Sequence, residues 1–250
     1  MNPALNLLAQ GSWDVFVPYG RLHALTLVVC ALLIAAPTFL GRALAKDAEA
    51  LLRQTLAAIA VCYWLAYNAW WNRHGLDPRT GLPLHICDLN GLIAPFALWT
   101  GQRWTRATLY FWTAALTLQA FIQPSLTAGP ALPVFWAFGV AHTIITASAV
   151  YDVAVLGFRP TWRDLGYALA ASAIYLVAIV PIDLWLGANY GFVGNPAEAR
   201  EIPPFVAALG PWPRRVIVLA ALTACGFVVI LLPWVLTAPR PRLQPTGTKP

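Results

Sequence analysis

One short segment of the chain gathers several side chains that are able to do chemistry. Residues 85–90 read His-Ile-Cys-Asp-Leu-Asn, and they follow Pro83, a residue type that favours the first turn of a helix. The free amide groups at a helix start favour a thiolate, so Cys87 is the natural nucleophile of this segment. Acyl transfer through a covalent intermediate also needs a base and a group that stabilises the oxyanion. Asn90 is suited to the second of these roles.

The base has to come from another part of the chain. His142 lies midway along a later apolar run, so it is able to approach the thiol from a neighbouring helix. His85 is less suited, because a regular helix turns 100° per residue and therefore points it about 200° away from Cys87. His85 and Asp88 share a helix face and are expected to pair with each other. Asp183 is expected to orient His142, which would complete a relay of the triad type.

Membrane helices must position these residues. Hydrophobic residues make up 59% of the 250-residue chain and charged residues 10%, whereas soluble domains carry about 25% charged residues. A spanning helix needs about 20 mostly apolar residues, and the apolar runs predict an all-α, seven-helix transmembrane bundle. One domain is expected over residues 1–238, followed by a disordered tail at 239–250. The predicted spans are Leu22–Leu40, Leu52–Trp71, Leu84–Thr100, Thr105–Ile122, Pro133–Leu156, Leu165–Leu186 and Val216–Leu236.

The basic residues predict the orientation of this bundle. They stand singly between apolar runs, which is typical of loops that flank membrane helices and unlike a nucleic-acid-binding patch. Ten of the 16 lysines and arginines flank one side of the predicted bundle and six flank the other. The more basic side is expected to be cytoplasmic. The N-terminus is then outside and the C-terminus inside.

Polar residues that are distant in the sequence converge in this topology. The starts of the first, third and fifth spans lie on the outer side, together with the ends of the second, fourth and sixth. Polar groups at membrane depth are costly, so their convergence in the outer half of the bundle predicts a functional site. Its candidate members are His23, His85, Cys87, Asp88, Asn90, Gln119, His142, Asp183, Asn189 and Tyr190.

Taken singly, several of these residues also have a structural interpretation. His23 is able to reach the membrane interface, and His142 to hydrogen-bond a helix carbonyl. Asp88 near a helix start complements the helix dipole. The joint placement of the residues, more than any one of them, favours a site.

The same motifs, taken in order, resemble a known family. They extend from about Phe16 to Trp212 and comprise 16–19 followed by His23, 82–90, Gln119 with Pro124, His142, Asn189-Tyr190, Asn195-Pro196 and 210–213. This pattern resembles the bacterial YwaF-like integral membrane family, whose eukaryotic relatives include transmembrane protein 164. The chain departs from the family at Pro213-Arg214, where a Trp-Tyr pair is usual.

The resemblance implies a helical bundle in the bacterial plasma membrane with a Cys/His acyl-transfer site. Transmembrane protein 164 is described as an acyltransferase that loads fatty acyl chains onto lyso ether phospholipids. A more distant cousin, the androgen-induced-gene family, hydrolyses fatty-acid esters with a membrane Thr and His. We therefore expect an enzyme that moves acyl chains between phospholipids and lysophospholipids through a Cys87 thioester, without a metal or another cofactor.

Other functions stay open. A metal-dependent lipid hydrolase would use His23, His85 and His142 together with Asp88 or Asp183, although no two histidines have the spacing of helical ligand pairs. A lipid transporter or scramblase is a second alternative, although the two halves of the chain show no similarity. A purely structural membrane protein is a third. A retinal protein is excluded because no lysine lies within the seven spans.

The predicted orientation can be tested with single cysteines introduced into a chain that lacks its own four. A cysteine within 187–215 should react with a membrane-impermeant maleimide in intact cells, because that loop is expected outside. A cysteine within 157–161 should react only after lysis. The reverse labelling pattern would show that the bundle is inserted the other way.

Overall fold

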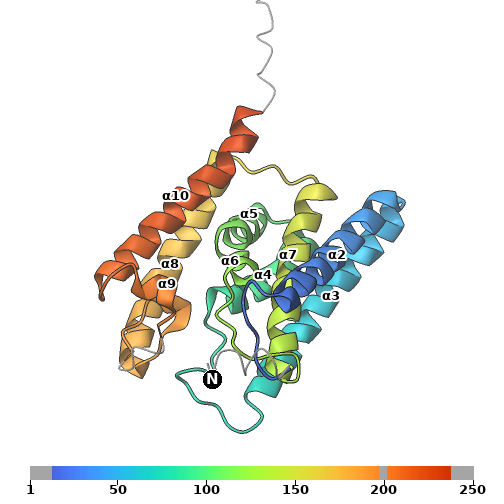
Figure 1. The fold of residues 1–250 in the computed structure, drawn as a ribbon. Helices are drawn as coiled ribbons and strands as arrows, with labels where there is room; N and C mark the ends of the chain where they lie inside the picture. The colour runs from blue at the N-terminus through green and yellow to red at the C-terminus, as the bar shows by residue number, and fades with distance from the viewer. Residues whose placement is uncertain (1–12, 197–201, 238–250) are drawn as a thin grey trace, which may run out of the picture.

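The computed structural model describes residues 13–196 and 202–237, which form a bundle of helices (Figure 1). The expected tail at 239–250 lies outside these residues. Within the described part, β-type pairing is limited to one antiparallel bridge between Val15 and Ala128. The helices are α2 (Arg21–Ala43), α3 (Lys46–Trp71), α4 (Ile86–Thr100), α5 (Arg103–Trp112), η1 (Thr113–Thr117), α6 (Gln119–Ile122), α7 (Pro133–Ala154), α8 (Trp162–Leu186), η2 (Tyr190–Phe192), α9 (Pro204–Ala207) and α10 (Arg214–Leu236).

Five of the described helices are long and apolar enough to cross a membrane, namely α2, α3, α7, α8 and α10. Their outward faces carry large apolar side chains, among them Leu32, Ile174 and Val177, that are largely exposed. Such a surface suits hydrocarbon and would be poorly hydrated in water. The chain is therefore an all-helical integral membrane protein.

The two remaining predicted spans take a different form. Helix α4 has 15 residues, which is fewer than the roughly 20 that a spanning helix needs. The predicted span Thr105–Ile122 is divided into α5, a π-helical turn η1 and the short α6. The backbone N–H of Leu118 bonds the carbonyl of Thr113, five residues back, at 3.0 Å. The expectation of seven complete spans thus stays a prediction, with five spans supported by helix length.

The two irregular elements lie at the centre of the bundle. Helix α4 packs against α3, α5 and α7, while α2 packs on α7. On the other side, α8 packs on α5, and α10 contacts η1 and α8. Figure 1 shows α8 and α10 together on one flank and α2, α3 and α7 on the other, with α4 to α6 between them. The central helices are therefore shielded by longer ones.

Small residues allow the central helices to approach closely. Ala94 and Ala97 of α4 and Ala107 of α5 are fully buried. Ala94 and Ala97 belong to one apolar cluster with Ile145 and Ala149 of α7. Since lipid gives no hydrophobic drive for helices to associate, close packing of this kind supplies much of the attraction between them.

Ion pairs tie the helices together at one end of the bundle. Arg103 at the start of α5 forms two hydrogen bonds with the buried carboxylate of Asp164, at 2.8 and 2.6 Å. Arg106 contacts the buried Asp152 near the end of α7, at 2.8 Å. A buried carboxylate is far less costly when it is paired in this way. The candidate site residues belong to the opposite ends of these helices.

Candidate functional site

The start of α4 places Cys87 in the first helical turn. Helix α4 begins at Ile86, and His85 precedes it with an extended backbone. Oδ2 of Asp88 accepts a hydrogen bond from the backbone N–H of His85 at 3.2 Å, so the carboxylate caps the helix start. The spacing of His85 and Asp88 predicts that the two side chains pair with each other; in the structure, Asp88 bonds the backbone of His85 instead.

The ring of His85 is held by the loop that follows α8. Its Nδ1 accepts a hydrogen bond from the backbone N–H of Gly191 at 3.3 Å. Its ring centroid lies 5.2 Å from that of Tyr190 and 5.9 Å from that of Phe192. Gly191 has a φ of +60°, and a Cβ at this position would collide with the side chain of Tyr175. Glycine is thus required where this loop meets the start of α4.

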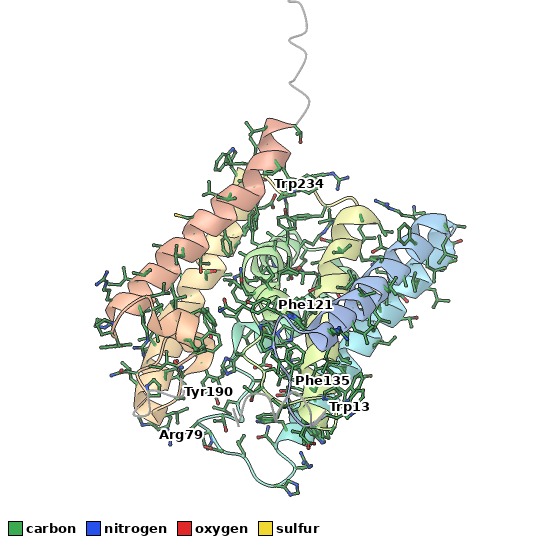
Figure 2. All side chains as sticks on the ribbon, viewed as in Figure 1. Trp13, Arg79, Phe121, Phe135, Tyr190 and Trp234 are labelled. Atoms are coloured by element: carbon green, nitrogen blue, oxygen red, sulfur yellow. The ribbon has the colours of Figure 1, made fainter. Side chains whose placement is uncertain are left out.

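A group of hydrogen bonds, called here the loop clasp, fixes the chain just before α4. The hydroxyl of Tyr190 accepts from the N–H of Leu82 at 3.0 Å and donates to the carbonyl of Pro78 at 2.9 Å. The hydroxyl of Tyr175 donates to the carbonyl of Leu84 at 2.9 Å. Burial raises the pKa of Tyr190, which keeps its phenol protonated and able to donate. Tyr190 lies at the same end of the molecule as Arg79 (Figure 2).

Asp183 belongs to the loop clasp. Its side chain is fully buried, and Oδ1 accepts a hydrogen bond from the backbone N–H of Tyr190 at 2.9 Å. Asn189 precedes Tyr190, and its carbonyl accepts from the N–H of Phe192 at 3.2 Å. Asp183 forms no hydrogen bond with His142 in the described structure. Its observed role is to shape the loop that holds His85.

A second group, the thiol network, consists of Cys87, Asn90, Thr113 and Thr117. Asn90 is fully buried, and its amide donates to the hydroxyls of Thr113 at 3.0 Å and Thr117 at 3.2 Å. The side chain of Thr117 in turn lies beside that of Cys87. The thiol thus faces a line of polar groups contributed by α4 and the π-helical turn.

His142 is buried in α7 between two aromatic rings. Its ring centroid lies 4.2 Å from that of Phe138 and 6.2 Å from that of Phe121 in α6. Its Nδ1 lies 2.7 Å from the carbonyl of Phe138. A carbonyl only accepts, so Nδ1 carries the proton and Nε2 of the neutral ring is a free base. Within the described residues, Nε2 has no hydrogen-bond partner.

Two further candidates have simpler roles. Nδ1 of His23 accepts from the N–H of Tyr19 at 2.9 Å, and Nε2 donates to the carbonyl of Phe121 at 2.8 Å. His23 therefore joins the start of α2 to the end of α6. The side chain of Gln119 is exposed and makes no hydrogen bond within the described part of the chain.

Packing between α4 and α7 relates Cys87 to His142. A Cβ built on Gly91 of α4 would lie 3.8 Å from Ile145 of α7, so these two positions face each other. The two helices run in the same direction, because the end of α4 leads into α5, whose Arg106 is paired with Asp152 near the end of α7. Cys87 and His142 each lie about one turn before this contact. They therefore share a level, although no hydrogen bond joins them in the described structure.

Comparison with known proteins places the chain in a family. A family model described as the TMEM164 family matches residues 18–232. This chain belongs to the TMEM164 family. The matched range contains every residue of the loop clasp and the thiol network, as well as His23 and His142. No curated protein and no solved structure matches the chain.

In this member of the TMEM164 family, the predicted site residues fall into separate groups. The loop clasp includes Asp183 and Tyr190, and it holds His85. The thiol network takes in Cys87 and Asn90. His23 and His142 lie on either side of α6. Within the described residues, no three His, Cys, Asp or Glu side chains are grouped as a metal site would need.

Sequence reasoning missed the residues that link these groups. Thr113 and Thr117 stand four residues apart in an apolar run, and this spacing signals a shared helix face. Nothing in the sequence shows that the helix widens there into a π turn. The carbonyl of Phe138, which orients His142, is equally invisible because every residue carries one.

The hydrogen bonds predict a distinct tautomer for His142. Nitrogen NMR of histidine-labelled protein in micelles should show the Nδ1–H form for His142 and the Nε2–H form for His23 and His85, whose Nδ1 atoms both accept. The variant His142→Gln should remove the Nδ1–H signals and leave the others in place. Loss of an Nε2–H pattern instead would mean that the basic nitrogen faces Phe138.

Proposed function

We propose that this protein transfers fatty acyl groups between membrane phospholipids and lysophospholipids, with Cys87 as nucleophile and His142 as base. We place the site in the outer half of the bacterial plasma membrane: the resemblance implies this membrane, and the basic loop residues predict the orientation. It goes beyond family membership, which by itself assigns no reaction to the chain. Its support is the geometry around the thiol.

The observation that carries the proposal is that one broken helix touches both residues. Thr117 in η1 lies beside Cys87. Phe121, one turn later in α6, packs its ring edge-on against His142. The positions Gly91 and Ile145, which face each other, lie next to Cys87 and His142 along α4 and α7. The thiol and the imidazole are therefore related both by this helix contact and by the broken helix. We propose that a substrate carbonyl is held between them.

Acyl transfer takes place in two steps, formation of the thioester and its transfer to the acceptor. His142 removes the thiol proton, and the Cys87 sulfur attacks the carbonyl carbon of a donor ester to form a C–S bond, while the carbonyl π electrons move to oxygen. The C–O bond then breaks, and His142 returns its proton to the departing lysolipid alkoxide. In the second step, an acceptor hydroxyl gives its proton to His142 and attacks the thioester, which releases the thiolate.

The surroundings of the two residues favour transfer over hydrolysis. The rings of Phe121 and Phe138 cover His142, and the side chain of Cys87 is half-buried. The loop clasp covers the start of α4. Water has to be kept away from a thioester if another lipid is to accept the acyl group.

An apolar groove gives a lipid chain a route to this region from the membrane. It opens between α3 and α7, where Tyr63, Tyr67 and Trp70 face Trp136 and Val140. No charged residue lines it. Lipid tails will fill such a surface when it faces the hydrocarbon.

The helix that forms one wall of the groove also contacts the start of α4. Tyr63 and Tyr67 flank Trp64 in the sequence, and the indole N–H of Trp64 donates to the carbonyl of Asp88 at 2.9 Å. Asp88 is the residue after Cys87, so the α3 wall of the groove continues to the first turn of α4. An acyl chain in the groove would have its carboxyl end near the nucleophile.

The catalytic roles can be tested with a lysophospholipid and a labelled diacyl donor in liposomes. Cys87→Ala should abolish transfer without lowering the thermal unfolding temperature, because a half-buried thiol contributes little packing. Cys87→Ser should retain at most a trace, since a hydroxyl is far less acidic. His142→Ala should lower the rate about 100-fold or more, as loss of a general base does. His85→Ala should have a smaller effect.

Cys225→Ala provides a matched control, because Cys225 is exposed on α10 and away from the site. It should transfer acyl groups at the wild-type rate. Full activity in Cys87→Ala would end the thioester mechanism and leave metal-assisted hydrolysis or lipid transport as the better explanation. A water-dependent release of fatty acid that needs Cys87 would make the protein a hydrolase that uses the same nucleophile.

The groove makes a second, separate prediction. Ala66 lines it, and Ala66→Trp should fill it and lower transfer from long-chain donors about tenfold, because the acyl chain is displaced from its productive position. Ala69→Trp places the same ring on an exposed part of α3 outside the groove and should have little effect. Alkylation of Cys87 by a small reagent should be unchanged in both. Equal losses in the two variants would rule out the groove as the acyl-chain site.

A further inference from the structure

One arginine of the bundle is buried without a counter-ion. Arg103 and Arg106 each contact a buried carboxylate, and Arg53 lies 3.5 Å from Glu49. These three arginines are half-buried or exposed, whereas Arg215 near the start of α10 is only 3% exposed. No carboxylate within the described residues pairs with Arg215. A buried charge without a partner is costly, and in a membrane protein it indicates a functional site.

Hydrogen bonds within the described chain use only one corner of this guanidinium. Nη2 of Arg215 donates to the carbonyl of Gly194. Nε is fully buried and has no hydrogen-bond partner. Nη1 also lacks a partner among the described residues, but it is not fully buried, so this edge of the group reaches the surface. The guanidinium therefore has unused donors that need an acceptor.

The position of Arg215 in its helix increases the cost of its charge. Helix α10 has 23 residues and carries no acidic residue in its first turn, where the helix dipole favours negative groups. This turn instead holds the exposed Arg214 beside Arg215. Two cations at the positive end of a helix are repelled by the dipole and by each other. A bound anion would remove both penalties.

We infer that the start of α10 binds a phosphate group, with Arg215 as its main ligand and Arg214 as a second cation. A guanidinium is planar and presents its N–H donors in a fork that matches the oxygens of a phosphate. Phosphate also carries the negative charge that this end of the helix lacks. A lipid head group and free phosphate share this chemistry. The inference does not depend on the proposed acyl transfer, because binding makes and breaks no covalent bond.

The phosphate site is joined to the loop that covers the start of α4. Gly194, whose carbonyl holds Arg215, lies three residues after Gly191, which bonds the ring of His85. The indole N–H of Trp212 donates to the carbonyl of the residue before Gly194, at 3.2 Å. Figure 1 shows the loop after α8, the short α9 and the start of α10 together at one end of the molecule. A phosphate held by Arg215 would therefore stabilise this loop.

The inference can be tested by lipid binding to the detergent-purified full-length protein. Native mass spectrometry compares dioleoylphosphatidylglycerol with dioleoylglycerol, which has the same chains and no phosphate. The wild type should bind the phospholipid about tenfold or more tightly, as charge-assisted hydrogen bonds predict. Arg215→Gln should lose this preference, because glutamine keeps a donor for Gly194 but has neither the charge nor the fork.

Two further variants complete the test. Arg163→Gln is the matched control, because Arg163 also lies in the first turn of a long helix but is exposed and followed by Asp164. It should keep the wild-type preference. Arg214→Gln should weaken phospholipid binding about threefold, as the loss of one exposed charge at a helix start predicts. Because Arg214 is exposed, this variant tests the site even if Arg215→Gln does not fold.

Thermal unfolding with added inorganic phosphate identifies the source of the phosphate group. Stabilisation of the wild type by inorganic phosphate, without a preference for the phospholipid and lost in Arg215→Gln, would assign the site to free phosphate. A preference for the phospholipid with no effect of inorganic phosphate would assign it to a lipid head group.

Two results would overturn the phosphate site. One is a wild type that neither prefers the phospholipid nor is stabilised by inorganic phosphate. The other is a folded Arg215→Gln variant that binds both ligands as the wild type does. Cys87→Ala should bind them like the wild type, so a failure of the acyl-transfer mechanism would leave these outcomes unchanged.

Discussion

Helix α4 rises about 22 Å over its 15 residues, which is less than the ~30 Å hydrocarbon core of a bilayer. Its far end leads directly into α5, whose first residue, Arg103, is held by Asp164 at the ion-paired end of the bundle. If that end lies at the membrane surface, the start of α4 lies at membrane depth. The first backbone N–H groups of a helix have no partner within it, and lipid offers none. The short central helix therefore obliges the rest of the protein to cover its start.

The loop clasp and Asp88 meet part of this requirement with residues from distant parts of the sequence. Asp88 caps the helix from within, while Tyr175 and Tyr190 bond the backbone that leads into it. Asp183 shapes the loop that carries Tyr190. An apolar setting strengthens the electrostatic effect of the helix start, because water does not screen it. The same arrangement places Cys87 at the positive end of the helix dipole.

Much of this structure could be predicted from composition and spacing, and the remainder depends on contacts that spacing does not encode. The five long helices follow from apolar runs, and the family from motifs such as 85–90 and His142. The short α4 and the broken helix after it were read as ordinary spans, since a buried apolar helix and a lipid-facing one have the same composition. Asp183 was assigned to His142 because both are polar and share a predicted depth. Depth does not fix direction around a helix axis, and the structure turns Asp183 toward the backbone of Tyr190.

The π-helical turn sets the register of everything that follows it. Before the turn closes, Thr117 faces Asn90 and Cys87; after it, Phe121 presents its ring to His142 and its carbonyl to His23. Because each residue of a helix turns about 100°, removing one residue from η1 would rotate Phe121 away from both histidines relative to α5. The extra residue of the π turn thus allows Thr117 to contact α4 while Phe121, one turn later, contacts α2 and α7. An irregular backbone normally weakens a helix in lipid, and here the lost regularity is offset by contacts with three neighbours.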